Sequence, residues 1–240
     1  MYESNESGER LDYMMKERFF KPVFLWVVAS AIFTLNAAEF KVGPSDQSPP
    51  KEISDSIRPL LAAKPIELQD GGKAILQFWP VKSLPLKSKP SSANTALNSI
   101  AETTLLGAIS VSGDGLKDYK DNDISKGVYT ARFILQPQNG DHLGTSEFNY
   151  FIALVGAADD KEPGSFTKFT PLVKASGKQT SSGHPLIISL QPVDSAAETP
   201  SLSTPAAEHK AIRLKLSGNA GGEKSDVPFD LVYEGHGHIQ

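Results

Sequence analysis

The sequence predicts an all-β fold, mainly an antiparallel β-sandwich of the immunoglobulin-like type with one or two short helices. Short runs rich in β-branched and aromatic residues recur along the chain, and turns of Gly, Pro and Ser separate them. Two of the strongest runs flank a single polar connection, which is typical of a hairpin. Strands and helices do not alternate as they do in a parallel sheet, so a doubly wound nucleotide-binding fold is disfavoured.

The N-terminal region, residues 1–38, has the pattern of a secretory signal peptide. Three basic residues precede 14 uncharged, mostly apolar residues, 22–35, and small residues follow them. A membrane-spanning helix needs about 20 apolar residues, so this run favours cleavage over a permanent anchor. We expect cleavage after Ala37 or Ala38.

The residues before this pattern are acidic and unlike the start of a signal peptide, so translation from Met14 or Met15 is an alternative. The mature chain is expected to be exported to the periplasm or the extracellular medium. It would remain anchored in the membrane if the signal were not cleaved. No other segment has the length and apolarity of a membrane span.

Composition excludes several classes of function. The net charge is −4 and no basic stripe is present, which argues against binding to nucleic acid. The chain has no cysteine, which excludes thiol nucleophiles, thiolate metal ligands and iron–sulfur clusters. An exported chain without disulfides must be stabilised by its core alone.

Beyond the signal peptide we expect a polar, Pro-rich linker over residues 39–50 and a single domain over residues 51–240. A connection rich in Ser, Pro and Lys, residues 83–98, is expected to be a surface or mobile loop. The low-complexity residues 194–208 are expected to be a solvated loop.

Within the domain, residues 51–64 and 165–176 carry apolar residues at helical spacing, and Pro59 and Pro171 limit each to a short helix. Period-two alternation and β-branched residues predict the strands. In chain order, the expected strands are 66–68, 73–79, 102–110, 128–135, 148–155, 185–190, 211–216 and 228–233.

The central prediction is a core hairpin over residues 127–155. Its two strands alternate in side-chain direction, so that each presents two faces. The connection between them, residues 136–145, contains Pro and Gly turn residues together with several polar side chains. One face of the first strand is expected to carry Val128, Thr130, Arg132 and Ile134.

The same connection places Asp141 beside His142, between Gly140 and Gly144. This pair is a candidate for binding a ligand or metal, or for a base oriented by its neighbour. The alternative is a tight turn in which Asp141 accepts hydrogen bonds from backbone amides. His184, at the start of a buried strand, would approach this loop if the strands are neighbours.

Two further groups are weaker candidates. His236 and His238 lie on one side of an extended backbone and could capture a metal ion, although we favour an exposed tail that binds transition metals only adventitiously. Asp118, Asp121 and Asp123 resemble part of a calcium loop but lack its glycine and terminal glutamate. We therefore interpret them as a solvated acidic turn.

No nucleophile elbow, zinc-protease motif or phosphate-binding glycine loop is present. Four segments, however, together resemble a family of small exported bacterial proteins with no assigned activity. The resemblance covers most of the chain from residue 51 onward. The segments are FWPVKSLP (78–85), KGVYTAR (126–132), QPQNGDHLG (136–144) and SG…GHP (176–185).

This chain departs from the family pattern in the spacing that residues 179–182 introduce and in the insertion at residues 194–208. The resemblance implies a single exported domain with His142 and His184 in recurring motifs, and it supplies no reaction.

Three hypotheses follow from the sequence. The favoured one is an exported, non-catalytic β-sandwich that binds an unidentified partner or ligand at the envelope, either a protein or a small molecule. The second is a zinc- or copper-binding domain that uses His142 and His184, with Asp141 and the C-terminal histidines as further ligands. The third is a hydrolase of a polysaccharide or ester, which requires a polar cleft near residues 140–145.

Overall fold

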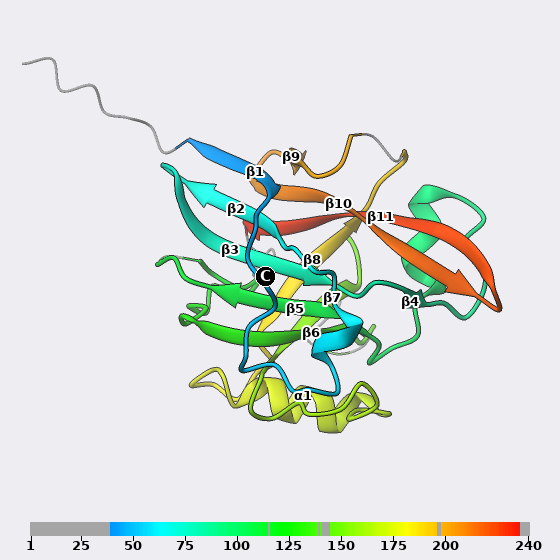
Figure 1. Cartoon of the computed structure of the whole chain (residues 1–240), viewed down its shortest axis with the longest axis horizontal. Coiled ribbons are helices and arrows are strands. Elements are labelled where there is room, and N and C mark those ends of the chain that lie inside the picture. Colours follow the sequence, from blue (N-terminus) through cyan, green and yellow to red (C-terminus); the bar gives the residue numbers. More distant parts are fainter. Residues whose placement is uncertain (1–38, 115, 139, 141–144, 196–197, 236–240) are drawn as a thin grey trace, which may run out of the picture. The chain divides into compact units, whose positions relative to one another are not determined.

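The computed structural model describes residues 39–114, 116–138, 140, 145–195 and 198–235. Within Ala37–Gln240 these residues belong to one compact unit. Eleven strands can be assigned in this described part, and they form one sheet, mainly antiparallel. The prediction of an all-β fold is therefore confirmed (Figure 1).

The strands follow the sheet order β1-β2-β3-β5-β6-β7-β8-β11-β10-β4, and β9 pairs separately with β10. Each pair is antiparallel except the short contact between β4 and β10. The bounds are β1 (Phe40–Pro44), β2 (Ile66–Asp70), β3 (Lys73–Pro80), β4 (Leu84–Pro85), β5 (Leu105–Val111), β6 (Gly127–Leu135), β7 (Tyr150–Gly156), β8 (Ile187–Pro192), β9 (Ser201–Ala206), β10 (His209–Ala220) and β11 (Glu223–Glu234).

The predicted hairpin is the β6–β7 pair, with Leu135 opposite Tyr150 and Tyr129 opposite Gly156. Strand β8 then connects β7 to β11. Its first half pairs with β7 and its second half pairs with β11, so one short strand joins the two parts of the sheet. The finer expectation of an immunoglobulin-like sandwich stays a prediction, because this single path fits a folded sandwich and a closed sheet equally.

The first strand lies close to strands β10 and β11 near the other end of the path, and the sheet is nearly closed. The ring of Phe40 in β1 lies 5.3 Å from the ring of Tyr233 in β11, and the ammonium of Lys210 in β10 lies 5.4 Å from the Phe40 ring. Residues 39–50 were expected to be a polar linker, and this is wrong for β1. Its residues pair with all of β2.

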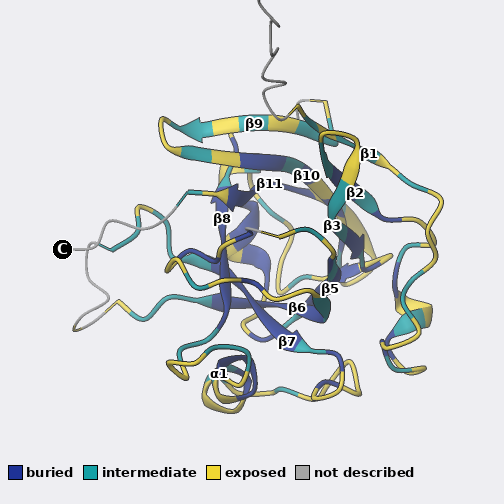
Figure 2. Ribbon diagram, turned by 90° about the vertical axis from the view of Figure 1, so that its left-hand side faces the viewer, coloured by how far each residue is buried: buried dark blue, intermediate teal, exposed yellow. Residues whose placement is uncertain are grey.

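Two apolar clusters explain why β6, β7 and β8 read as nearly continuous apolar runs. One face of these strands contributes Phe133 and Ile152 to the main core, and the other face contributes Ile134 and Phe151 to a second cluster. Helix α1 (Phe169–Gly177) covers this second cluster, as Figure 2 shows beside β7. Strands that are buried on both faces have no polar side to alternate with.

The predicted helix over residues 165–176 is confirmed by α1, whereas the one over residues 51–64 is wrong. That segment consists of turns and a single 3₁₀ turn, η1 (Arg58–Leu60). Most of its apolar residues at helical spacing are still buried. Ile53, Ile57 and Leu61 lie in the core, whereas Leu60 is 42% exposed. Tertiary packing, rather than helical hydrogen bonding, organises these apolar side chains.

Both expected loops contain regular structure. Residues 83–98 include β4 and most of η2 (Ala93–Ser99), whose Ala96 and Leu97 are buried, and residues 194–208 include β9. Strands β4 and β9 each cover part of the outer edge of β10. An uncovered edge would leave backbone donors and acceptors unpaired, which explains why these polar segments pair there. Within the described chain, no helix is long and apolar enough to cross a membrane.

Close packing between β3 and β5 provides a test of the register. A Cβ added at Gly107 would lie 2.3 Å from the Trp79 carbonyl oxygen and 2.6 Å from a ring carbon of Phe78. We expect Gly107→Ala to destabilise the fold by roughly 1–3 kcal/mol, because the backbone must shift. Urea denaturation measures this change. Gly43→Ala is the control, since nothing lies within 4 Å of its new methyl group, and an equal loss in both variants would contradict the register.

The contact that closes the sheet predicts a loss of stability at alkaline pH. Burial, together with the nearby carboxylates of Glu234 and Asp70, raises the pKa of the Tyr233 hydroxyl to about 12. An unfolded tyrosine ionises near pH 10, so the stabilisation is complete below that pH and is lost as pH rises from about 10 to 12. Denaturation midpoints across this range should fall in the wild type. The fall should be smaller in Tyr233→Phe, and equal slopes in both proteins would contradict this account.

Candidate functional site

The predicted site residues are only partly within the described chain. Asp141, His142, His236 and His238 lie outside it, so the proposed pairing of His142 with His184 stays a prediction. His184 is half-buried, and its Nδ1 lies 2.9 Å from the backbone oxygen of Pro185.

The topology does bring His184 to the connection between the hairpin strands. Because β7 pairs with both β6 and β8, the end of β6 lies close to the segment that precedes β8. Gln136 and Pro137, the first residues of that connection, line one cavity together with His184. We call this cavity of about 180 Å³ the α1 pocket, and its walls include Lys120, Ile134, Phe151, Phe169, Val173 and His184.

The acidic turn differs from the solvated one that we expected. The Asp118 side chain is buried, and its Oδ1 accepts hydrogen bonds from the backbone amides of Lys120 and Asn122, both at 2.8 Å. Its Oδ2 accepts a longer bond of 3.3 Å from the amide of Ile187 in β8. These oxygens stabilise the turn and attach it to the sheet. Among the residues that the structure describes, no group of three His, Asp or Glu side chains is arranged to hold a metal ion.

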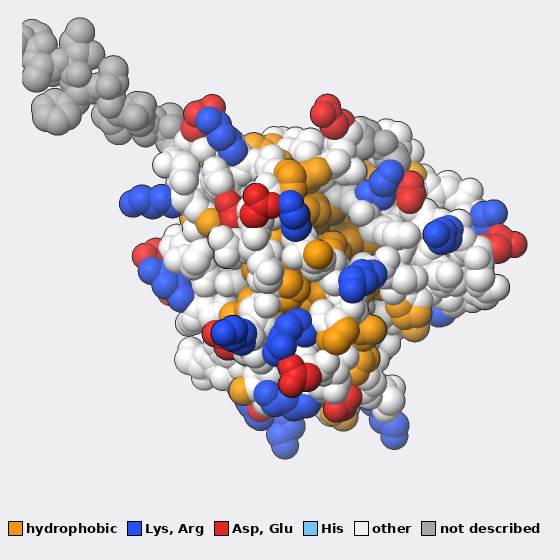
Figure 3. Space-filling view, viewed as in Figure 1, with side chains coloured by type: hydrophobic (Ala, Val, Ile, Leu, Met, Phe, Trp, Pro, Cys, Tyr) orange, Lys and Arg blue, Asp and Glu red, His pale blue; other side chains and the backbone are white. Residues whose placement is uncertain are grey.

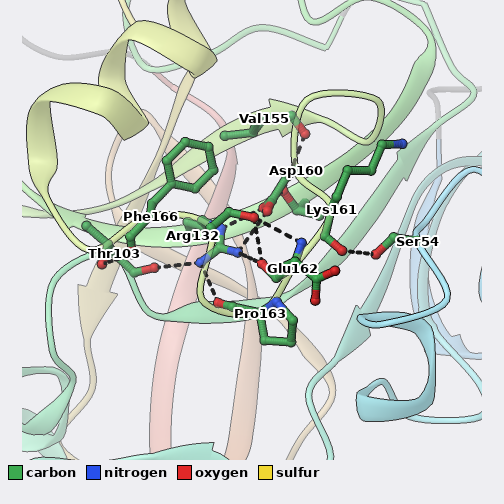
Figure 4. A network of polar contacts seen from close by, with 11 residues as sticks. Ser54, Thr103, Arg132, Val155, Asp160, Lys161, Glu162, Pro163 and Phe166 are labelled. Atoms are coloured by element: carbon green, nitrogen blue, oxygen red, sulfur yellow. Dashed lines mark hydrogen bonds and ion pairs between the residues drawn. The ribbon is translucent and has the colours of Figure 1, made fainter.

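The most extensive polar cluster is one that the sequence analysis did not identify as a site. Arg132 of β6 and Asp160 are both 0% exposed, and they form a two-point ion pair (Figure 4). The Arg132 Nε donates to Asp160 Oδ2 at 2.6 Å, and Nη2 donates to Oδ1 at 2.9 Å. Thr130, on the same face of β6, donates to Asp160 Oδ2 at 2.5 Å.

The remaining donors of Arg132 are also used. Nη1 donates to the carbonyl oxygens of Thr103 at 3.0 Å and Pro163 at 3.1 Å, and Nη2 donates to that of Glu162 at 2.9 Å. A guanidinium has five N–H groups, so each has an acceptor. A cation whose donors are all satisfied by the protein has no donor left for a ligand, and Arg132 is therefore structural.

Thr103 is held in an uncommon backbone conformation beside this cluster. Its φ is 70°, a value that costs energy for a β-branched residue. Three hydrogen bonds maintain it: its carbonyl accepts from Arg132, its amide donates to the Phe133 carbonyl at 2.7 Å, and its hydroxyl donates to the Phe166 carbonyl at 2.8 Å. The Phe166 ring also lies 5.1 Å from the Arg132 guanidinium.

Thr103 and Phe166 also line a cavity between described residues. This mainly apolar groove has a volume of about 630 Å³, and we call it the Leu60 groove. Its lining includes Leu60 and Pro85 on one side and Thr103, Pro163 and Phe166 on the other. Figure 3 views the face that carries η1, where apolar side chains are exposed between charged ones.

The sequence contained one signal for this arrangement. Arg132 lies in a strand whose neighbours are apolar, and a buried arginine requires a carboxylate and further acceptors. That signal predicts a buried partner, but it does not identify Asp160 among the acidic residues or reveal the groove above it.

No protein family, no curated protein and no solved structure matches the chain. The family resemblance noted from the motifs therefore stays a prediction.

The buried ion pair provides a test of this architecture. We expect Arg132→Met to destabilise the protein by about 3–5 kcal/mol, because it leaves the Asp160 carboxylate buried without a cation. The double variant Arg132→Met/Asp160→Leu should recover part of this loss, since it removes both charges. Urea denaturation of both variants measures the difference.

The control is Lys126→Met, which breaks the exposed ion pair with Asp114 and should leave the denaturation midpoint unchanged. If Arg132→Met were no more destabilising than this control, the ion pair between Arg132 and Asp160 would not organise the fold.

Proposed function

We propose that this protein is an exported, non-catalytic binding domain that holds a small, largely apolar ligand in the Leu60 groove. The observation that carries the proposal is the hydrogen bonding of Arg132 to residues that line the groove. Arg132 Nη1 bonds both the Thr103 and the Pro163 carbonyls, and these two residues come from separate segments that line the groove. Their separation is set before any ligand arrives, and such preorganisation reduces the entropy lost on binding.

The size of the groove favours a small molecule. Its volume of about 630 Å³ falls within the range of roughly 300–1,000 Å³ that is usual for small-molecule sites. Its lining is rich in proline and aliphatic side chains, with the half-buried Phe166 as the aromatic surface. An apolar ligand gains free energy from covering such surface.

The charged residues of the groove support binding rather than chemistry. Lys82 donates from Nζ to the Pro59 carbonyl at 2.7 Å, and Glu102 accepts from the Leu135 amide at 3.2 Å. Both side chains therefore hold parts of the groove wall in place. The Ser83 hydroxyl is suited to orient a ligand that carries a neutral polar group, whereas the Thr104 hydroxyl already donates to the Ala101 carbonyl at 2.6 Å and can only accept.

Leu60 makes the proposal testable with a matched control. Within the described chain the exposed large aliphatic side chains are Leu60, at 42%, and Leu202 on β9, at 41%. We expect 8-anilinonaphthalene-1-sulfonate, a fluorescent probe of apolar sites, to bind the folded protein. Leu60→Asp should weaken its affinity roughly tenfold or more, because a carboxylate disfavours both apolar contact and the probe's sulfonate.

Leu202→Asp introduces the same charge at the same exposure outside the groove and should leave the affinity unchanged. Denaturation midpoints for both variants ensure that the probe reports on folded protein. Equal affinities in the two variants, or no enhancement of fluorescence by the wild type, would overturn the proposal.

A further inference from the structure

We propose that the α1 pocket is a second, independent binding site, for a small organic carboxylate of about six carbon atoms. The proposal rests on three features: an apolar cavity left between α1 and the sheet, a cationic rim, and a buried carboxylate that positions this rim. It does not depend on the Leu60 groove.

The cavity lies where α1 packs on the outer face of β6, β7 and β8. Its walls are the side chains of Ile134, Phe151, Phe169, Val173 and Ile187. Its volume of about 180 Å³ is similar to that of an apolar protein cavity of roughly 150 Å³ that takes up benzene. The cavity therefore accommodates one short alkyl chain or one ring, and it is too small for a peptide segment of a partner protein.

A cavity of this kind has an energetic consequence. Wall atoms that face empty space lose dispersion contacts that they would make in a filled core. Phe169 and Val173 on α1 are half-buried, so these two walls of the pocket are partly open to solvent. A ligand with an apolar group restores these contacts when it enters.

The charged residues that line the pocket favour a carboxylate as the polar group of the ligand. Among the described residues, the lining contains Lys120 and His184 and no aspartate or glutamate. In the described chain the Lys120 ammonium forms no ion pair, unlike the ammonium of Lys117 in the same turn, which lies 3.2 Å from Asp123. A carboxylate on the ligand would supply the missing counter-charge.

The buried Asp118 explains why Lys120 lines this pocket. Its Oδ1 accepts the Lys120 amide, its Oδ2 accepts the Ile187 amide, and the Tyr119 amide donates to the Ile187 carbonyl at 2.9 Å. The turn is thus attached to β8, whose Ile187 is itself a wall of the pocket. The Asp118 carboxylate, two residues before Lys120, accepts backbone amides and so fixes where the Lys120 backbone lies.

The probe for this site is hexanoate, compared with 1-hexanol and hexylammonium, which have the same number of carbon atoms but a neutral or positive end. Titration calorimetry with the full mature domain measures the three affinities. We expect hexanoate to bind at least about tenfold more tightly than either analogue. Equal affinity of hexanoate and hexanol would overturn the assignment of a carboxylate site, and absence of hexanoate binding would overturn the site itself.

Variants locate the binding. Lys120→Gln should remove the preference for hexanoate over hexanol, while Lys174→Gln, on α1 but outside the lining, should leave it unchanged. Val173→Trp fills the cavity and should abolish binding of both ligands, and Val173→Met, a milder filling, should weaken it if the tryptophan variant does not fold.

Hexanoate binding that persists unchanged in a folded Val173→Trp variant would overturn the location. The same variants should retain 8-anilinonaphthalene-1-sulfonate binding at the Leu60 groove, so failure of one site is distinguished from failure of the other.

Discussion

The structure depends on one buried ion pair. Arg132 and Asp160 are both fully buried, and placing two charges in a protein interior carries a large desolvation cost. The cost is offset because the Asp160 carboxylate accepts hydrogen bonds from Nε and Nη2 of Arg132. Three backbone carbonyls accept hydrogen bonds from the remaining N–H groups. Removing any partner would leave a buried polar group unsatisfied, so the segment that follows β7 and the segment that precedes β5 have one arrangement relative to β6.

This arrangement has consequences for both cavities. The segments that Arg132 holds form a wall of the Leu60 groove. Further along, the chain after Phe166 enters α1, which covers the outer face of the central strands and encloses the α1 pocket. Both cavities therefore arise from the same requirement, which is to cover strands that are apolar on two faces and to satisfy the charges buried among them. Their linings share no residue, so ligands at the two sites can be studied separately.

Predictions from the sequence succeeded where the pattern is local and strong. The β6–β7 hairpin and α1 were predicted because strand alternation and helical spacing are properties of neighbouring residues. Predictions failed for polar segments that pair with distant strands. Residues 39–50, 83–98 and 194–208 look like linkers or loops, yet β1, β4 and β9 form in them, because an edge of the sheet offers backbone partners whatever the side chains are.

The sequence by itself determined the all-β class, the central hairpin and the absence of cysteine chemistry, since these follow from composition and from periods of two residues. It also singled out His184, although not what surrounds it. Tertiary structure alone decided that Asp160 pairs with Arg132, that His184 shares a pocket with Gln136, and that Lys120 lines the same pocket. The physical reason is that a residue pattern reports which face of a strand is buried, whereas contacts between strands depend on pairing across long stretches of chain, which no local period encodes.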